Sequence, residues 1–227
     1  MISKRPLVGV IGGMGTQATA CFYEELHSMQ RVDREQEYLD VLLYSMPSIP
    51  DRTAFITGKS PVSPLEPLLS AASTLESAGA SLLVMLCITS HYFFDDLKGA
   101  VGIPFLSMPE ETALYSRERG FGKVGLLATN GTLKGRVLQN AFERVGIDVV
   151  APLDCFQADL MAMIYDIKRG VSVAPVMLEA MVDALRGDGA DAVVLGCTEL
   201  CVIAGGELGV INTLDVLAGA VLRVCGV

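Results

Sequence analysis

Two cysteines of this 227-residue chain, Cys87 and Cys197, each follow an apolar run and precede small hydroxyl residues. Both runs begin with a Gly-Ala pair, at residues 79 and 189, and each cysteine lies eight positions after that glycine. Short runs rich in Val, Leu and Met predict strands that are buried on both faces, as in parallel sheets. Each thiol is therefore predicted to lie at the carboxyl end of a buried strand, where open α/β sheets bind their ligands.

For two thiols that face each other, the chemistry we expect is proton transfer at a stereocentre. One thiolate removes the proton from one face of the carbon, and the opposite thiol delivers a proton to the other face. A turn or helix start is predicted after both cysteines, so we expect their pKa values to fall below the ordinary thiol value of about 8.5. The competing interpretation is that each cysteine is a small buried apolar side chain. Their equivalent positions favour catalysis.

A second motif is repeated in the segments that would position the thiols. Residues 124–132 (VGLLATNGT) match residues 8–16 (VGVIGGMGT) position by position: VG, two aliphatic residues, three loop residues, GT. Each copy predicts a strand, a glycine loop and a helix, the helices running from about residues 17 to 29 and 133 to 145. The glycine at the second position of each copy precedes its cysteine by 78 residues in the first half and 72 in the second.

Two motifs repeated in the same order indicate an internal duplication. We therefore predict an α/β fold of two pseudo-symmetric lobes with mainly parallel sheets and an active site in the cleft between them. The predicted first lobe comprises residues 1–101 with the tail 211–227, and the second comprises residues 102–210.

Two cations are candidates for binding an anionic substrate. Arg52 follows the strand predicted at residues 39–44, on a loop that its prolines are expected to make rigid. Lys168 ends the helix predicted at residues 159–168, where a lysine is more often a solvated charge. A further strand is predicted at residues 103–107. His91 is expected to be a hydrogen-bonded residue at a helix start and not a base.

The glycine loop at residues 12–15 has two functional interpretations. Residues 13–18 satisfy G-x-G-x-x-A, the dinucleotide fingerprint, but the acidic residue needed at the end of the second strand is missing. The alternative is a loop whose backbone N–H groups bind a carboxylate at a helix N-terminus. The matching loop at residues 130–132 favours the carboxylate.

Composition narrows the classes of partner. The net charge of −9 argues against nucleic acid or an anionic membrane. No apolar run reaches the roughly 18 residues of a membrane span, and no secretory leader is recognised. The scattered cysteines predict reduced thiols in a cytoplasmic protein, and two histidines are too few for a zinc site. Four cysteines are expected to be core or surface residues: Cys21, Cys155, Cys201 and Cys225.

Six segments resemble the aspartate/glutamate racemase family, specifically its aspartate racemase branch. They are residues 11–19 (IGGMGTQAT), 49–54 (IPDRTA), 87–92 (CITSHY), 127–132 (LATNGT), 164–170 (IYDIKRG) and 196–200 (GCTEL). They span almost the whole chain in family order, and the IPDRT and GCTE segments are quite specific.

The resemblance implies a cofactor-independent, usually dimeric enzyme that inverts the α-carbon of a small dicarboxylic amino acid, aspartate first and glutamate second. Cys87 and Cys197 would be its acid–base pair, and Arg52 and Lys168 would bind the distal carboxylate. Seven more residues would lie around the substrate: Met14, Gly15, Thr89, Ser90, Thr129, Thr198 and Glu199. No metal is implied.

The chain departs from the family pattern at two positions. Ile88 stands where family members usually carry Asn, and Thr16 stands where proline often follows the glycine. Because an amide next to the first thiol would contact the substrate, three alternatives stay open. They are a decarboxylase or isomerase of small dicarboxylates, a racemase of another amino acid, and a small-molecule binding protein without catalysis. A dinucleotide enzyme is the weakest alternative.

Overall fold

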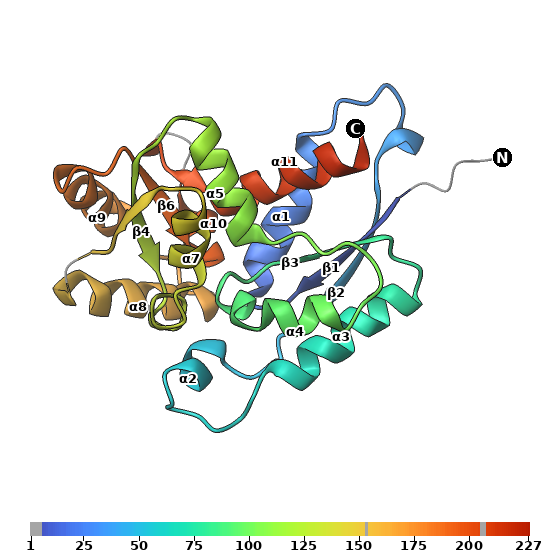
Figure 1. The fold of residues 1–227 in the computed structure, drawn as a ribbon, viewed down its shortest axis with the longest axis horizontal. Coiled ribbons are helices and arrows are strands. Elements are labelled where there is room, and N and C mark those ends of the chain that lie inside the picture. The colour runs from blue at the N-terminus through green and yellow to red at the C-terminus, as the bar shows by residue number, and fades with distance from the viewer. Residues whose placement is uncertain (1–5, 153, 205–207) are drawn as a thin grey trace.

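A computed structural model describes residues 6–152, 154–204 and 208–227 and shows two parallel sheets, each covered by helices (Figure 1). The first sheet has the order β2-β1-β3 and the second the order β5-β4-β6-β7. The strands are β1 (Leu7–Gly12), β2 (Asp40–Ser45), β3 (Leu82–Met85), β4 (Lys123–Ala128), β5 (Asp148–Val150), β6 (Ala192–Gly196) and β7 (Ile211–Asn212). The predicted α/β class with two lobes of parallel strands is confirmed.

The register of the two sheets reflects the repeated motifs. Val8 of β1 lies opposite Leu82 of β3, and Val124 of β4 lies opposite Ala192 of β6. In both sheets the strand that precedes a predicted loop is central, and the strand that precedes a cysteine is its neighbour. β3 and β6 are buried along their whole length, as their continuous apolar runs predict.

The helices follow the predicted order of elements. Those around the first sheet are α1 (Thr16–Ser28), α2 (Arg52–Ile56), α3 (Leu65–Ser77) and α4 (Phe94–Gly99), with the short 3₁₀ helices η1 (Glu35–Glu37) and η2 (Thr89–Phe93). The remaining helices are α5 (Met108–Glu118), α6 (Asn130–Lys134), α7 (Val137–Arg144), α8 (Asp154–Lys168), α9 (Val176–Gly187), α10 (Thr198–Ile203) and α11 (Thr213–Cys225). None of the helices in the described ranges is long and apolar enough to cross a membrane.

Three local predictions are wrong. Arg52 begins α2 instead of lying on a loop, because the Asp51 carboxylate accepts a hydrogen bond from the Ala54 N–H and caps the helix. The single helix predicted at 133–145 is two helices, α6 and α7, separated where Arg136 adopts a left-handed φ of 51°. The strand predicted at 103–107 is reduced to an isolated bridge between Phe105 and Leu83.

The C-terminal tail contacts both lobes. Its strand β7 pairs with β6 of the second sheet, whereas α11 packs against α1 and α5 (Figure 1). Phe22 of α1 and Leu217 of α11 belong to an apolar core that also includes Val124 and Val194 of the second sheet. The predicted division at residues 101/102 and 210/211 stays a proposal, and the pairing of β7 argues for attaching residues 211–212 to the second lobe.

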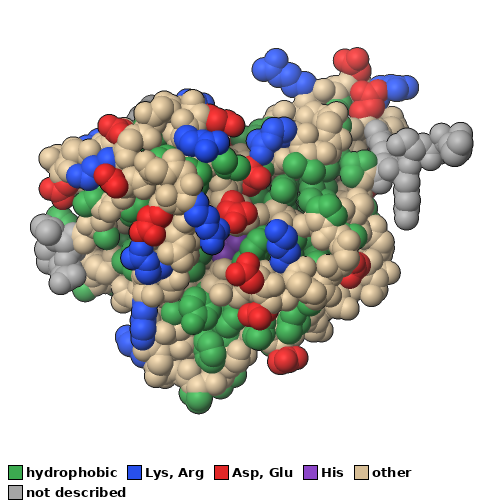
Figure 2. Space-filling model, in the orientation of Figure 1, with side chains coloured by type: hydrophobic (Ala, Val, Ile, Leu, Met, Phe, Trp, Pro, Cys, Tyr) green, Lys and Arg blue, Asp and Glu red, His purple; other side chains and the backbone are tan. Residues whose placement is uncertain are grey.

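Charged side chains are interspersed on the face of the molecule shown in Figure 2, where Lys and Arg lie next to Asp and Glu. Several are paired, among them Arg144 with Glu110 at 3.0 Å and Arg223 with Glu111 at 2.5 Å. Such exposed pairs each contribute about 0–1 kcal/mol to stability.

Candidate active site

Cys87 and Cys197 occupy equivalent places in the two lobes. Cys87 lies between β3 and η2, and Cys197 follows β6 directly and is the N-cap residue of α10. Both thiols are buried, each residue being 5% exposed. The structure thus places both cysteines at the carboxyl ends of buried parallel strands, as the sequence predicts.

The glycine loop after β1 is held against the loop after β2. Met46 donates its N–H to the Gly12 carbonyl at 3.1 Å, and Gly13 donates its N–H to the Thr19 hydroxyl at 2.9 Å. Gly15 is the N-cap residue of α1, and Ser90 donates to the sulfur of buried Met14 at 3.3 Å. One N–H of the predicted carboxylate-binding loop, that of Gly13, therefore already has an intramolecular partner.

Gly13→Ala should destabilise the protein by at least about 3 kcal/mol, because strain in the left-handed region adds to a steric clash. Gly13 has a φ of +89°, and a Cβ there would lie 2.3 Å from the Met46 nitrogen. The control is Gly58→Ala, since Gly58 has a similar φ of +80° with open space around it. It should cost only about 1–2 kcal/mol. Urea denaturation of both variants measures the difference, and equal losses would contradict the clash.

Arg52 is buried beside Cys87. Its Nη1 donates to the carbonyls of Ile49 and Pro50 at 3.1 and 3.0 Å, and its guanidinium interacts electrostatically with Cys87. Burial lowers the pKa of Arg52, but the charges of Cys87 and Asp51 outweigh it and the net shift is upward. Nε has no partner among the described residues. Arg52 is therefore a buried cation with a free donor.

Cys197 has an anionic partner instead. Its thiol donates to Glu199 Oε2 at 2.9 Å, and Glu199 is 3% exposed. The pKa of Cys197 lies well above the ordinary thiol value, because burial and the Glu199 charge both disfavour the thiolate. The predicted lowering of this pKa is wrong. A position at a helix start does not lower the pKa of Cys197 enough to offset a carboxylate in direct contact with the thiol.

Lys168 approaches the same carboxylate from α8. Its Nζ lies 3.9 Å from Glu199 Oε1, and its side chain is 21% exposed. Burial lowers the pKa of Lys168, but the charges of Glu199 and Cys197 more than compensate, so the net shift is upward. Glu199 Oε1 accepts no hydrogen bond from the residues that the structure describes. A Cβ on Gly15 would lie 2.8 Å from this oxygen, so Gly15 leaves space for Glu199.

Hydroxyl groups join the lobes behind the thiols. Thr89 Oγ1 lies 2.9 Å from both Thr129 Oγ1 and Thr132 Oγ1. Thr129 also caps α6 by accepting the Thr132 N–H at 3.1 Å. These three threonines, with Ser90 and Thr198, are buried. Thr89 and Thr129, predicted as substrate contacts, are thus brought together but already hydrogen-bonded to each other.

Tyr165 and Asp51 form a contact that the sequence analysis missed. Tyr165 on α8 donates to Asp51 Oδ2 at 2.9 Å, which connects the two lobes next to Arg52 and Lys168. The bond contributes to the raised pKa of Tyr165, about 12, although burial is its main cause. The pKa of Asp51 falls despite burial, because Ala54, Tyr165 and Lys168 favour the carboxylate. The spacing in the sequence could have placed Tyr165 at the site, because it lies three residues before Lys168 and so on the same face of the helix.

A cavity of about 300 Å³ brings the predicted cations together. The residues that line it are Gly13, Met14, Gly15, Thr16, Pro47, Ile49, Asp51, Arg52 and Lys168. Neither cysteine lines it directly: Cys87 is connected to it through one side chain, Arg52, and Cys197 through two, Glu199 and Lys168. No metal-binding group of three or more His, Cys, Asp and Glu side chains occurs in residues 6–152, 154–204 and 208–227.

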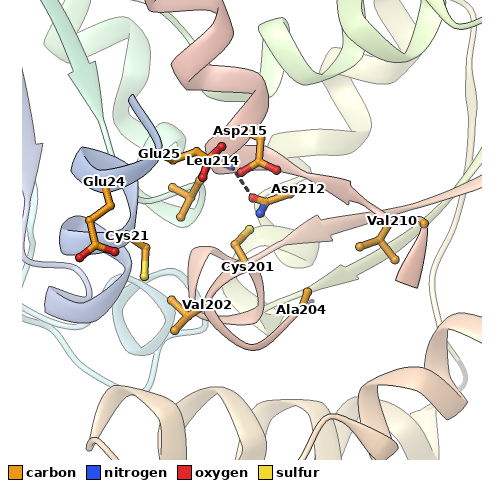
Figure 3. Close-up of a pocket in the computed structure, with 11 residues that line it drawn as sticks. Cys21, Glu24, Glu25, Cys201, Val202, Ala204, Val210, Asn212, Leu214 and Asp215 are labelled. Atoms are coloured by element: carbon orange, nitrogen blue, oxygen red, sulfur yellow. Dashed lines mark hydrogen bonds between the residues drawn. The ribbon is translucent and has the colours of Figure 1, made fainter. Parts of the chain in front are cut away.

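A larger cavity, of about 480 Å³, is lined by residues of α1, α10 and the start of α11 (Figure 3). Cys21, Cys201 and the carboxylates of Glu24, Glu25 and Asp215 line it, and its described lining includes neither Lys nor Arg. Burial raises the pKa of Cys201 to about 11. A cavity with such weakly acidic thiols and without cations does not fit an anionic substrate, so the candidate site is the cavity with Arg52 and Lys168.

His91 packs under Cys87 as a neutral structural residue, as predicted. Its Nε2 accepts the Met108 N–H at 3.2 Å, so Nδ1 carries the proton and donates to the Cys87 carbonyl at 2.9 Å. Burial lowers its pKa to about 4.

The neutral state of His91 predicts loss of stability in acid. The folded pKa lies below the unfolded value, so the stabilisation is complete above about pH 6.5 and is lost as pH falls towards 4, by about 3 kcal/mol in total. Denaturation at pH 7 and pH 4.5 should show this loss in the wild type and in the His27→Gln control. It should largely disappear in His91→Gln. An identical pH dependence in all three proteins would contradict it.

The family model of Asp/Glu/hydantoin racemases matches residues 11–221 of this chain. The solved structure of an aspartate racemase from Picrophilus torridus is 31% identical, with a TM-score of 0.87 over 97% of this chain and 94% of that one. The broad specificity amino-acid racemase RacX of Bacillus subtilis is 22% identical over 86% of each chain. A glutamate racemase of Roseiflexus is 31% identical over 67% of this chain and 59% of its own length.

Proposed function

The chain belongs to the Asp/Glu/hydantoin racemase family and is a PLP-independent amino-acid racemase, and from this premise we propose that it racemises aspartate, and glutamate more slowly. Cys87 and Cys197 are the proposed acid–base pair. The observation that carries the substrate class is the pair of cations on one cavity, Arg52 and Lys168. The similarity to an aspartate racemase supports the choice of aspartate over glutamate.

In this proposal Arg52 and Lys168 bind the distal carboxylate. Both remain charged at neutral pH, since the net pKa shift of each is upward. Nε of Arg52 supplies a donor that has no hydrogen-bond partner among the described residues. Two cations at one end of the substrate fix its orientation and hold the α-carbon close to the thiols, which removes the entropic cost of their encounter from the chemical step.

Proton transfer then proceeds between two buried sulfurs. One thiolate removes the α-proton, and the other thiol donates its proton to the opposite face, so the configuration inverts. The low exposure of Cys87 and Cys197 excludes water and strengthens local electrostatic interactions. Five residues are assigned to the surroundings of the α-carboxylate and α-ammonium: Met14, Gly15, Ser90, Thr198 and Glu199. Thr89 and Thr129 support them from behind.

We further propose that the enzyme works as a homodimer in the cytoplasm. A mechanism that needs two free thiols is suited to a reducing compartment. Cys87 and Cys197 are both unpaired in the structure. Light scattering of the purified protein tests the dimer.

A substrate panel tests the proposed function. Purified enzyme without added PLP is incubated with each L-amino acid, and the enantiomers are separated by chiral chromatography. Aspartate should give the highest kcat/KM. A best rate with an apolar amino acid would identify a racemase of another substrate. Turnover of small dicarboxylates without amino-acid racemisation would indicate a decarboxylase or isomerase, and thermal stabilisation by aspartate without turnover would indicate a binding protein.

A further inference from the structure

The two thiols differ in their partners, and we propose that the Glu199 carboxylate is the proton acceptor of the Cys197 thiol, so that the two thiols are not equivalent. This inference rests on the proposed two-thiol mechanism and assigns unequal roles within it. The strands that carry the cysteines are equivalent, but the charged groups that act on them are of opposite sign: Arg52 interacts electrostatically with Cys87, and Glu199 accepts a hydrogen bond from Cys197.

Glu199 is positioned to take a proton from sulfur. Its Oε2 accepts the Cys197 S–H at 2.9 Å, and the hydroxyl of Thr198 approaches the same oxygen at 3.4 Å. The nearest cation, Lys168, lies 3.9 Å from the other oxygen. That oxygen has no hydrogen-bond partner among the described residues although it is buried. Because the S–H of Cys197 already points at Oε2, a short shift along this hydrogen bond would move the proton from sulfur to oxygen.

The equivalent position beside Cys87 carries no carboxylate. Thr89 stands two residues after Cys87, as Glu199 stands two residues after Cys197. Thr89 is directed to the hydroxyls of Thr129 and Thr132, and the charged side chain that interacts electrostatically with Cys87 is that of Arg52. A fixed cation stabilises a thiolate, whereas a fixed anion opposes one.

The two directions of the reaction use different proton transfers. With Cys87 as base, its sulfur forms an S–H bond with the α-proton, and Cys197 releases its proton to the opposite face of the carbon. In the reverse direction, the Cys197 S–H bond first breaks and an O–H bond forms on Glu199 Oε2. The Cys197 thiolate then removes the α-proton and keeps it in a new S–H bond, Cys87 supplies the proton for the opposite face, and Glu199 afterwards releases its stored proton to the solvent.

Alkylation kinetics test the difference between the two thiols in the ligand-free enzyme. Iodoacetamide reacts with thiolates, and peptide mass spectrometry gives the rate at each cysteine separately. Cys87 and Cys197 are equally exposed, so their rates report ionisation and not access. We expect Cys87 to react at least about tenfold faster at pH 7.5, because a like charge shifts ionisation by about one pKa unit or more. Cys201, buried on the same helix, is the internal reference.

The Glu199→Gln variant separates a proton acceptor from a structural role. Removing the charge should raise the alkylation rate of Cys197 about tenfold. Losing the acceptor should lower racemisation about 10²-fold. Glu199→Asp, which retains the carboxylate, should bring both the alkylation rate of Cys197 and the rate of racemisation part of the way back to the wild-type values. A loosened fold would instead raise the rates at Cys87 and Cys201 as well.

Two results would overturn the inference: alkylation of wild-type Cys197 at least as fast as that of Cys87, or an unchanged Cys197 rate in Glu199→Gln. Both leave the proposed racemisation intact. Conversely, an enzyme that racemises no amino acid but retains the alkylation order would contradict the proposed function alone.

Discussion

Cys87→Ser and Cys197→Ser should each lose at least about 10³-fold in the racemisation of aspartate, because each step needs one sulfur to accept a proton and the other to donate one. A serine hydroxyl is far too weak an acid to replace either thiol at neutral pH. The structure places both cysteines in equivalent, buried positions at strand ends. Chiral chromatography after incubation with L-aspartate and with D-aspartate measures both directions.

The matched control is Cys201→Ser. Cys201 is buried like the other two and lies one helical turn after Cys197, but it lines the separate cavity of Figure 3. Its replacement should change racemisation by no more than about twofold, since its thiol takes no part in proton transfer. Wild-type rates of racemisation in both Cys87→Ser and Cys197→Ser would exclude the two-thiol mechanism. A large loss in these two variants and in Cys201→Ser would point to a general packing defect.

Arg52→Gln should lower kcat/KM for aspartate about 10²- to 10³-fold. Truncating one partner of a buried, hydrogen-bonded charge pair costs about 2–5 kcal/mol, and 1.4 kcal/mol corresponds to tenfold. Arg52 has two roles in the proposal, one at the distal carboxylate and one at the Cys87 sulfur. Calorimetric binding of succinate, which has two carboxylates and no α-ammonium, isolates the first role, and iodoacetamide alkylation of Cys87 isolates the second.

Arg169→Gln is the control for this loss of charge. Arg169 follows Lys168 directly, is exposed, and pairs with Asp166. Its replacement should leave succinate binding and racemisation within about twofold of the wild type. Unchanged succinate affinity in Arg52→Gln would refute the assignment of Arg52 to the distal carboxylate.

Much of the fold follows from local pattern. The apolar runs before Cys87 and Cys197 predict buried parallel strands, and the matched loops predict the duplication, because both signals are contained in short segments. The boundary at Asp51 was missed although Asp is a good N-cap residue, because the prolines beside it argued against regular structure. The break at Arg136 depends on a left-handed residue, for which arginine carries no signal.

The electrostatics of the site could not be read from the sequence. The contact between Asp51 and Tyr165 joins residues 114 positions apart, and the placing of Arg52 beside Cys87 depends on how α2 packs against η2 and α6. Glu199 was placed near the substrate by resemblance, but its contact with Cys197 reverses the pKa shift expected for that thiol.

The departure from the family pattern at Ile88 also has a structural context. The side chain is 1% exposed and belongs to the apolar core that spans both lobes. The isoleucine therefore contributes to packing immediately beside the first thiol.

Racemisation of L-aspartate in deuterated water tests the two-thiol account most directly. The thiols exchange their protons with the solvent, so the thiol that donates carries deuterium. Proton NMR combined with chiral separation, early in the reaction, should find deuterium at Cα of the D-aspartate formed while the remaining L-aspartate keeps its proton. Protium retained in the product, or deuterium appearing first in the recovered L-aspartate, would contradict transfer between two separate sulfurs.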